Sequence, residues 1–509
     1  MQKCSLVGCN REIYHPSSDD IKEYYKDTTK CILHCDKSHR MKSNHRTQME
    51  IDFKKAFTDY IEINNSNSSD ITIIDIHFPV NYDKYEDIYE YLSLLNDYDK
   101  IHFINCYFYM ESNGHFNLGD KTVLFDSCII KGDFWQLHDY KSFYNYDNDS
   151  KHLKHIYQYC IFEVKEIFNS CKELNSSQFF SCSFKDLSLE GCLINEPLFI
   201  YRNDHGETQK SGLKFENIKL KNSNFDSRFE INEYKDSGGV YIDECYFQQK
   251  FNFKNNEVSH IEINDTNFSG ILDLFKTRSD YIFMRKCTLN EMAFFEECEF
   301  SINKKACLSS YEHVTFKEFV GFRNTSFYSG LDISKSNFYN KANFLNIKIE
   351  PNISNNQKKS NRETLRIIKN SFDDIGNHID ANDYFAEELR QRKIELYNSK
   401  KNFDKKFIFV FNDLISKFGQ SYFRPFILLL LSIIYFHILT SEDITNWYKN
   451  IESIKYIFSA LNSIIRDATF LSVVIKTNDG LAFIRAIFYI WYGILIWNII
   501  IAVKRHVKR

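Results

Sequence analysis

The sequence predicts a mainly β protein: a β-helix of short stacked strands, preceded by a small metal-binding segment and followed by a helical membrane region. Three observations lead to this prediction. Pairs of a small and a bulky residue recur in the middle of the chain with a period near 21 residues and half-periods near 11. Cysteines and a histidine gather near the start, and two long apolar segments lie near the end.

Length and charge bound the possible functions. A chain of 509 residues is too long for one compact core, so we expect several structural regions. Lys and Arg number 64 against 68 Asp and Glu, which leaves a net charge of -4. A general nucleic-acid binder needs a basic surplus to release phosphate counterions, so we expect no nucleic-acid partner. No apolar signal-peptide segment opens the sequence, so we expect the 14 cysteines to be thiols or metal ligands in a reducing compartment.

Changes of pattern divide the chain into five regions. We expect a Cys/His zinc knuckle over 1–44, a helical N-terminal cap over 45–100, the β-helix over 101–350, a helical hairpin or linker over 361–420 and a membrane region with two transmembrane helices over 421–509. Pro351 and the polar run after it mark the end of the β-helix.

The first region has the spacing of a structural zinc site. Cys4 and Cys9 form one pair of ligands, and Cys31 and His34 form a second pair after a long insert. Two such knuckles can surround a tetrahedral Zn²⁺ without leaving an open catalytic position. Because the segment has few apolar residues, metal ligation would supply its folding free energy. We therefore predict Cys4, Cys9, Cys31 and His34 as the ligands.

Other ligand sets remain open from the sequence. Cys35 directly follows His34 and can replace it as the fourth ligand. His15 and His39 lie in the same segment and can compete. The alternative to a zinc site is a group of unrelated thiols.

Region 45–100 combines helical and extended patterns. Apolar residues at helical spacing predict a first helix, namely Met49, Phe53, Ala56, Phe57 and Tyr60. Residues 71–78 favour a strand, and a second helix is expected over 83–95.

The repeat occupies 101–350. A small residue, most often Cys, stands two positions before a bulky apolar residue. The pairs are Cys106/Phe108, Cys128/Ile130, Cys160/Phe162, Cys182/Phe184, Cys192/Ile194, Ser223/Phe225, Cys245/Phe247, Thr266/Phe268, Cys287/Leu289, Cys298/Phe300, Thr325/Phe327, Ser336/Phe338 and Ala342/Phe344. Side chains two positions apart lie on the same face of a strand. The cysteines between 106 and 307 are therefore expected to pack as small apolar side chains rather than to bind metal.

The spacing of the bulky residues predicts how the coils stack. Phe225, Phe247 and Phe268 follow one another at one full period, whereas Leu289 and Phe300 are only half a period apart. We expect one coil per full period, with equivalent positions on opposite sides of the coil and bulky residues stacked from coil to coil. Inserts are expected to interrupt the repeat near 111–122, 135–157, 200–214 and 230–240.

These units resemble the pentapeptide-repeat family, whose motif places a small residue or Cys two positions before a central Leu or Phe. The best matches are Asn105-Cys-Tyr-Phe108, Ser181-Cys-Ser-Phe184, Ser336-Asn-Phe338 and Lys341-Ala-Asn-Phe344. The resemblance covers 101–350 and implies a right-handed, quadrilateral β-helix. It also implies a scaffold or interaction surface. The chain lacks phosphate-loop, zinc-protease and nucleophile-elbow motifs, so we expect no enzyme.

Region 361–420 reads as a helical hairpin. One face is apolar at Leu365, Ile368, Phe372 and Ile375, a break follows at Gly376, and a longer helix is expected over 381–398. Such a hairpin would cap the last coil and couple it to the membrane region.

Two apolar segments predict membrane spans. The segment 422–439 is near the lower length limit, and Ala486–Val503 carries no charge along its whole length. Lys and Arg flank the outer ends of both, so we expect a multi-pass protein of the inner (cytoplasmic) membrane with its N-terminal domains and C-terminus cytoplasmic. The alternative is one span and one buried core helix.

Two functions fit these regions. The first is a membrane-tethered scaffold whose cytosolic β-helix binds an unidentified protein partner, with the lipid bilayer as its second partner. The second is an oligomeric two-span channel or membrane effector gated by the cytosolic β-helix, which would require a homo-oligomer. The polar residues of the second apolar segment are Gly493 and Asn498, and so few polar groups favour an anchor over a pore.

Overall fold

The computed structural model describes residues 2–15, 29–37, 43–64, 68–79, 92–110, 118, 121–135, 155–167, 173–174, 177–201, 214–301, 307–349, 360–398, 403–440 and 482–507. The chain forms two compact units, Met1–Lys359 and Ser360–Arg509, which are described separately. The first unit is mainly β and the second is helical.

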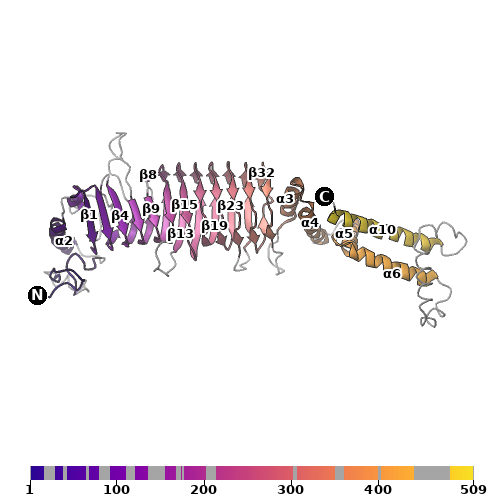
Figure 1. Cartoon of the computed structure of the whole chain (residues 1–509), viewed down its shortest axis with the longest axis horizontal. Coiled ribbons are helices and arrows are strands. Elements are labelled where there is room, and N and C mark those ends of the chain that lie inside the picture. Colours follow the sequence, from indigo (N-terminus) through magenta and orange to yellow (C-terminus); the bar gives the residue numbers. More distant parts are fainter. Residues whose placement is uncertain are drawn as a thin grey trace. The chain divides into compact units, whose positions relative to one another are not determined.

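Parallel strands stack along the first unit in three sheets (Figure 1). The 12-stranded first sheet contains β1 (Asp70–Ile74), β2 (Lys100–Ile104), β4 (Thr122–Asp126), β6 (His155–Gln158), β9 (Ser177–Phe180), β12 (Leu198–Tyr201), β15 (Phe229–Asn232), β18 (Phe251–Asn252), β21 (Leu272–Asp273), β25 (Ala293–Phe294), β29 (Val320–Gly321) and β33 (Ala342–Asn343). The 8-stranded third sheet contains β8 (Glu173–Leu174), β11 (Leu193–Ile194), β14 (Asn224–Phe225), β17 (Tyr246–Phe247), β20 (Asn267–Phe268), β24 (Thr288–Leu289), β28 (Thr315–Phe316) and β32 (Asn337–Phe338).

The 14-stranded second sheet divides into two ladders after its longest strands. It contains β3 (Tyr107–Met110), β5 (Ile129–Trp135), β7 (Ile161–Ile167), β10 (Ser183–Glu190), β13 (Phe215–Lys221), β16 (Ser237–Asp243) and β19 (Glu257–Asn264). One ladder then continues through β22 (Arg278–Ser279), β26 (Glu299–Phe300), β30 (Ser326–Phe327) and β34 (Lys348–Ile349), and the other through β23 (Ile282–Arg285), β27 (Ser309–Glu312) and β31 (Leu331–Asp332). Each later coil therefore supplies four short strands.

The predicted stacking of bulky residues is confirmed in the third sheet. Phe225 pairs with Phe247, Phe247 with Phe268, and Phe268 with Leu289. The first two ring centroids are 4.4 Å apart and the next two 5.0 Å apart, so the rings stack face to face. Phe300 lies in the second sheet, because half a period of the repeat crosses to another side of the coil.

A second aromatic ladder, absent from the sequence prediction, fills the first sheet. Phe103, Phe125, Tyr157 and Phe179 are fully buried on successive coils. Their centroids are 5.2, 4.8 and 4.8 Å apart. Ile101, Val123 and His155, rather than small residues, stand two positions before the first three rings, so the small–bulky motif did not find this ladder. The signal they do carry is alternation, since β2 and β4 place every second side chain inside.

A left-handed residue precedes most of the small residues of the repeat and turns the chain at a corner of the coil. These residues have φ between 43° and 65°: Asn105, Ser127, Tyr159, Ser181, Gly191, Asn222, Glu244, Asp265, Lys286, Glu297 and Asn324. His313 and Asn346 have the same conformation before the larger residues Val314 and Ile347. The small side chain that follows fits under the corner. The Cys128 thiol, for example, donates to the carbonyl oxygens of Asp126 and Phe103 at 3.4 and 3.5 Å. The same pair of bonds, one within the coil and one to the preceding coil, is made by the thiols of Cys106, Cys160, Cys182, Cys287 and Cys298.

The insert predicted near 230–240 is wrong. Strands β15 and β16 continue the first and second sheets through it. Gly238 permits close packing here, because a Cβ at this position would lie 1.5 Å from the carbonyl oxygen of Glu216. Most residues of the other three predicted inserts lie outside the described residues.

The predicted first helix is α2 (Ser43–Asn64), and its apolar face packs inward through Met49, Phe53 and Phe57. Residues 92–95 form a short 3₁₀ helix, η1 (Leu92–Leu95), while most of the second helix predicted over 83–95 lies outside the described residues. Only the first half of the strand predicted over 71–78 lies in β1, which ends at Ile74. Strand β1 pairs with β2 and makes the stack begin before residue 101.

The second unit contains α3 (Arg362–Asp374), α4 (His378–Asn398), α5 (Phe403–Ser416), α6 (Phe423–Thr440) and α10 (Ala482–Val507). Helices α3 and α4 form the predicted hairpin. The side chain of Asn361 accepts from the backbone N–H of Thr364 and caps α3, and Gly376 turns the chain with φ of 78°. The sequence prediction did not distinguish α5 as a separate helix.

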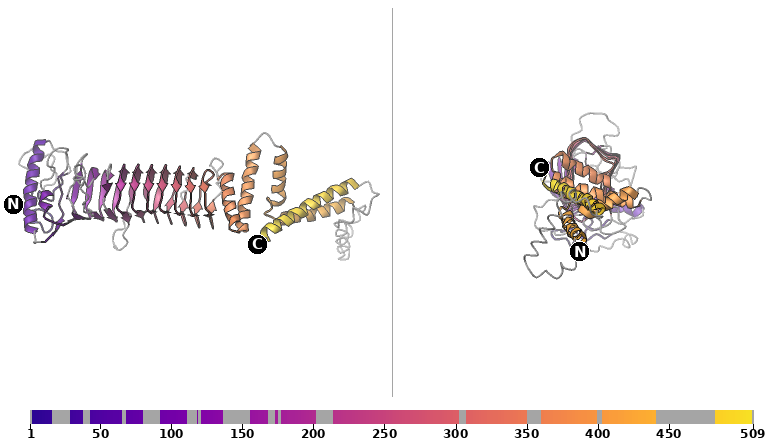
Figure 2. Two further views of the ribbon diagram at one scale, coloured as in Figure 1. Left: turned by 90° about the horizontal axis from the view of Figure 1, so that it is seen from above. Right: turned by 90° about the vertical axis from the view of Figure 1, so that its right-hand side faces the viewer.

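Helices α6 and α10 lie side by side (Figures 1 and 2). The rings of Phe436 and Phe488 are 5.0 Å apart, and the hydroxyl of Tyr492 donates to the carbonyl oxygen of Ser432. In the part of the chain that the structure describes, one helix is long and apolar enough to cross a membrane: residues Ala486–Arg505, with mean hydropathy 2.1 and 17% of the segment buried. The apolar stretch of α6, Phe423–Phe436, is shorter, so the structure does not support the predicted two-span topology. Length and composition alone make one such helix weak evidence of a membrane location.

Candidate metal centre

The segment 2–15 folds back on itself and brings Cys4 near Cys9. Lys3 and Glu12 form an antiparallel bridge, and the backbone N–H of Cys4 donates to the carbonyl oxygen of Arg11 at 2.9 Å. Gly8 has φ of 87°, which a residue with a side chain rarely adopts, so a tight turn can end at Cys9. The two thiols of this knuckle therefore face one side.

The second pair of candidate ligands lies on a single turn. The N–H groups of His34 and Cys35 both donate to the carbonyl oxygen of Cys31 at 3.0 Å. This turn places Cys31 and His34 on one side. Two backbone bonds, from Ser5 to Thr29 and from Tyr14 to Lys30, hold the segments 2–15 and 29–37 together.

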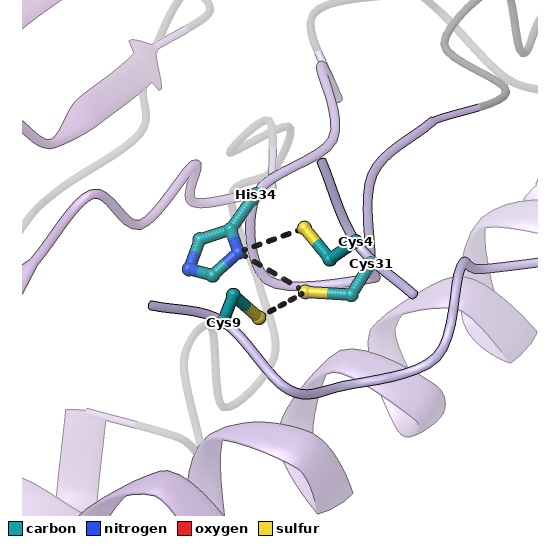
Figure 3. A group of neighbouring side chains, drawn as sticks. All are labelled: Cys4, Cys9, Cys31 and His34. Carbon is teal, nitrogen blue, oxygen red and sulfur yellow. Dashed lines mark hydrogen bonds between the residues drawn. The ribbon is translucent and has the colours of Figure 1, made fainter. Parts of the chain in front are cut away.

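The structure brings together the four residues predicted from the sequence, although they come from two separate segments (Figure 3). The ligand atoms of Cys4, Cys9, Cys31 and His34 all lie within 4.8 Å of one another. The Sγ atoms of Cys9 and Cys31 are 3.8 Å apart, and Nδ1 of His34 lies 3.5 Å from Sγ of Cys4 and 3.1 Å from Sγ of Cys31.

These three distances can be compared with the edges of a metal tetrahedron. With Zn–S near 2.3 Å and Zn–N near 2.0–2.1 Å, a tetrahedral site has edges of about 3.8 Å between sulfurs and about 3.6 Å between sulfur and nitrogen. Two of the three distances agree with these values, and the third is shorter. Four such donors can hold a metal ion.

Burial favours the neutral form of two candidate ligands, His34 and Cys31. Burial and the nearby Lys37 ammonium lower the pKa of His34 to about 4, so its imidazole is neutral at pH 7. Burial raises the pKa of the Cys31 thiol to about 12. A metal ion would have to displace the thiol protons, since the thiolate is the ligand form.

The alternative ligands are not part of this cluster. The Cys35 thiol is fully buried and donates to the carbonyl oxygen of Ile32 at 3.3 Å. His15 is exposed, and His39 lies outside the described residues. Among the cysteines of the repeat, those from Cys106 to Cys298 in the described ranges are buried in the stack, as predicted, and Cys307 is half-buried.

Lys37 joins the cluster segment to the first coil, and sequence reasoning missed it. Its side chain is completely buried. The ammonium donates to the carbonyl oxygens of Cys35 and His77 at 3.0 and 2.8 Å and lies 5.2 Å from the ring centroid of Phe53. Burial lowers the pKa of Lys37. A single lysine in a polar segment carries no sequence signal for such a role.

A backbone bond reinforces this connection. The N–H of His77, just after β1, donates to the carbonyl oxygen of Leu33 at 2.9 Å. The phenol of Tyr14 also donates to a carboxylate oxygen of Asp52 on α2 at 2.9 Å. The cluster segment therefore packs on the N-terminal end of the strand stack.

Comparisons with protein-family models, with curated proteins and with solved structures found no match for this chain.

Proposed function

We propose that this protein is a membrane-tethered scaffold, in which the strand stack presents a cytosolic surface to a protein partner. One observation carries the proposal: the same chain joins a long β stack to a span-length apolar helix that is only 17% buried. A core helix of a soluble protein would be mostly buried, because exposing that much apolar surface to water is costly. No catalytic motif was found in the sequence, which also favours a binding role.

We propose that the stack is a right-handed, quadrilateral β-helix of the pentapeptide-repeat type. Support comes from the small–bulky pairs and from the four strands that each later coil supplies. The outward side chains of such a rod vary freely from coil to coil, since only the inward positions are needed for stacking. That freedom suits a recognition surface.

We propose Zn²⁺ as the ion of the Cys4, Cys9, Cys31 and His34 cluster. Three thiolates and one imidazole in a closed tetrahedral arrangement are a typical structural zinc set. The cluster would stabilise a segment that has little apolar core of its own, and its role would be structural.

Membrane attachment is tested by alkaline washing of membranes that contain the full chain. We expect the full chain to stay in the membrane pellet, whereas a chain ending at Lys359, the boundary of the first unit, stays in the supernatant. Release of the full chain by the wash would contradict the tether. Circular dichroism of the shortened chain checks that its β structure is retained.

A second span at α6 and a pore are the other hypotheses from the sequence. The polar amide of Asn498 accepts from the hydroxyl of Ser416 at 3.1 Å and donates to the carbonyl oxygen of Ile494 at 2.8 Å. Those bonds use polar groups that a pore would turn toward its lumen. We therefore favour the tether. Conductance by an oligomer in a planar bilayer would reverse this preference.

A further inference from the structure

The helix α5 carries an apolar stripe that no described part of the chain covers. Phe403, Phe407, Val410 and Leu414 are 83%, 61%, 41% and 67% exposed. Their spacing of four, three and four residues places all four within an arc of about 60° of the helix. An unburied apolar stripe of this size needs a non-aqueous neighbour.

Contacts with α10 determine where this stripe lies. The ring of Phe411 is 5.8 Å from that of Trp491, and the hydroxyl of Ser416 donates to the side-chain oxygen of Asn498 at 3.1 Å. Both partners belong to the apolar segment Ala486–Arg505. Asn498 lies seven residues before Arg505, which is about 10 Å of helix. Trp491 lies fourteen residues before Arg505, which is about 21 Å of helix. A bilayer that surrounds this segment must therefore reach α5.

The polar groups of α5 point to the same placement. Asp413 pairs with Lys393 of α4 at 2.6 Å, away from the stripe. Lys405 and Lys406, at the start of α5, and Lys417, just after its end, can meet anionic headgroups. A helix with an apolar face, flanking lysines and less than a membrane-spanning length is typical of one that lies in a leaflet.

We propose that α5 is embedded in the cytoplasmic leaflet beside α10, with the stripe Phe403, Phe407, Val410 and Leu414 against lipid acyl chains. This inference rests on the proposed membrane tether and assigns to the bilayer a segment expected to be a cytosolic linker. A second copy of the chain is a poorer occupant, because the stripe covers only about two heptads and stable coiled coils need three or four.

Photolabelling tests the placement in the intact protein. The full chain is reconstituted into vesicles of phosphatidylcholine and phosphatidylglycerol that contain a phosphatidylcholine with a diazirine on its acyl chain. After illumination, mass spectrometry locates the lipid adducts. We expect adducts on α10 and, at comparable yield, on residues 403–414. Adducts on α10 without any on α5 would overturn the proposal and leave the tether intact, whereas adducts on neither would defeat the tether itself.

A pair of variants separates lipid contact from other causes. Phe407→Asp puts a carboxylate in the stripe and should lower the α5 adduct yield at least threefold while α10 remains labelled. Asn412→Asp adds a carboxylate about half a turn away on the same helix and should leave the yield unchanged. Equal yields in the two variants would contradict lipid contact at the stripe. A second result would also contradict it: α5 is not labelled, the detergent-extracted protein is a dimer, and Phe407→Asp converts this dimer to a monomer. A second copy of the chain, rather than lipid, would then cover the stripe.

Discussion

The Sγ atoms of Cys9 and Cys31 lie 3.8 Å apart in the N-terminal cluster, whereas the Cys287 thiol donates to the carbonyl oxygens of Arg285 and Ile263 at 3.3 and 3.4 Å. Cysteine thus serves as a candidate metal ligand in one part of the chain and as a small donor under a corner of the coil in another. The side chains around each sulfur determine which of these two roles it has. Single substitutions can distinguish the two roles.

At the cluster, Cys31→Ser should remove the metal while Cys35→Ser keeps it. Serine is a poor zinc ligand, and the Cys35 thiol bonds to the Ile32 carbonyl, a bond that a serine hydroxyl can replace. Metal analysis of the purified full chain should give about one zinc for the parent and for Cys35→Ser, and less than half for Cys31→Ser. A full equivalent of zinc in Cys31→Ser would refute the assigned ligand set.

Inside the stack, Cys287→Ser should be nearly neutral and Cys287→Leu destabilising. The same ladder carries Cys245 and Thr266 on the two preceding coils, so a hydroxyl already occupies an equivalent place. A leucine would overpack the corner, at a cost of about 1–3 kcal/mol in the free energy of unfolding. The midpoints of thermal unfolding measure both effects. Equal midpoints for the two variants would show that space under the corner is not limiting.

Glycine is required for different structural reasons at different positions of the stack. Gly191 turns a corner with φ of 65° and has no atom within 4 Å of the place where a Cβ would stand. Gly238, inside β16, would place a Cβ 1.5 Å from a backbone oxygen of β13. The first residue is selected by conformation and the second by the distance between strands.

We therefore expect Gly238→Ala to disrupt its strand and Gly191→Ala to be tolerated. The second change costs about 1–2 kcal/mol of left-handed strain, whereas the first forces two backbones apart. Hydrogen exchange of the amides in β13 and β16 should accelerate at least tenfold in Gly238→Ala only. Unchanged protection of these amides in Gly238→Ala would contradict the close approach of the two strands.

In the strand stack as a whole, every strand pairs with strands of the neighbouring coils, so disturbance should spread over short distances. The candidate metal cluster lies at one end, tied to the first coil by Lys37 and by the Leu33–His77 backbone bond. Loss of the metal should consequently loosen that end first.

Treatment of the full chain with a strong zinc chelator should raise hydrogen exchange in 29–37 and 70–78 and leave β28 and β32 protected. Restoring zinc should reverse the change, which serves as the control. Simultaneous loss of protection along the entire stack would contradict nearest-neighbour stability and indicate one cooperative unit instead.

Local patterns were enough for much of this architecture. A pair of side chains two positions apart lies on one face of a strand in any context, so the period of such pairs already indicates that coils stack and which rings meet, as Phe225, Phe247 and Phe268 do. The ligand spacing of Cys4, Cys9, Cys31 and His34 likewise restricts the geometry, because short knuckles allow few arrangements of their donors.

Other features depend on contacts between residues far apart in the chain, which no local pattern contains. The repeat, the candidate ligands and the long apolar helix could be read from the amino-acid order, because each is set by periodicity or composition within one segment. The folded chain was needed to show that Gly238 lies inside a sheet rather than in an insert, that Lys37 is buried beneath the first coil, and that α5 lies against α10. These three features depend on the close approach of two strands, on the burial of a side chain and on the packing of two helices. Such contacts form only when segments distant in the sequence meet in the folded chain.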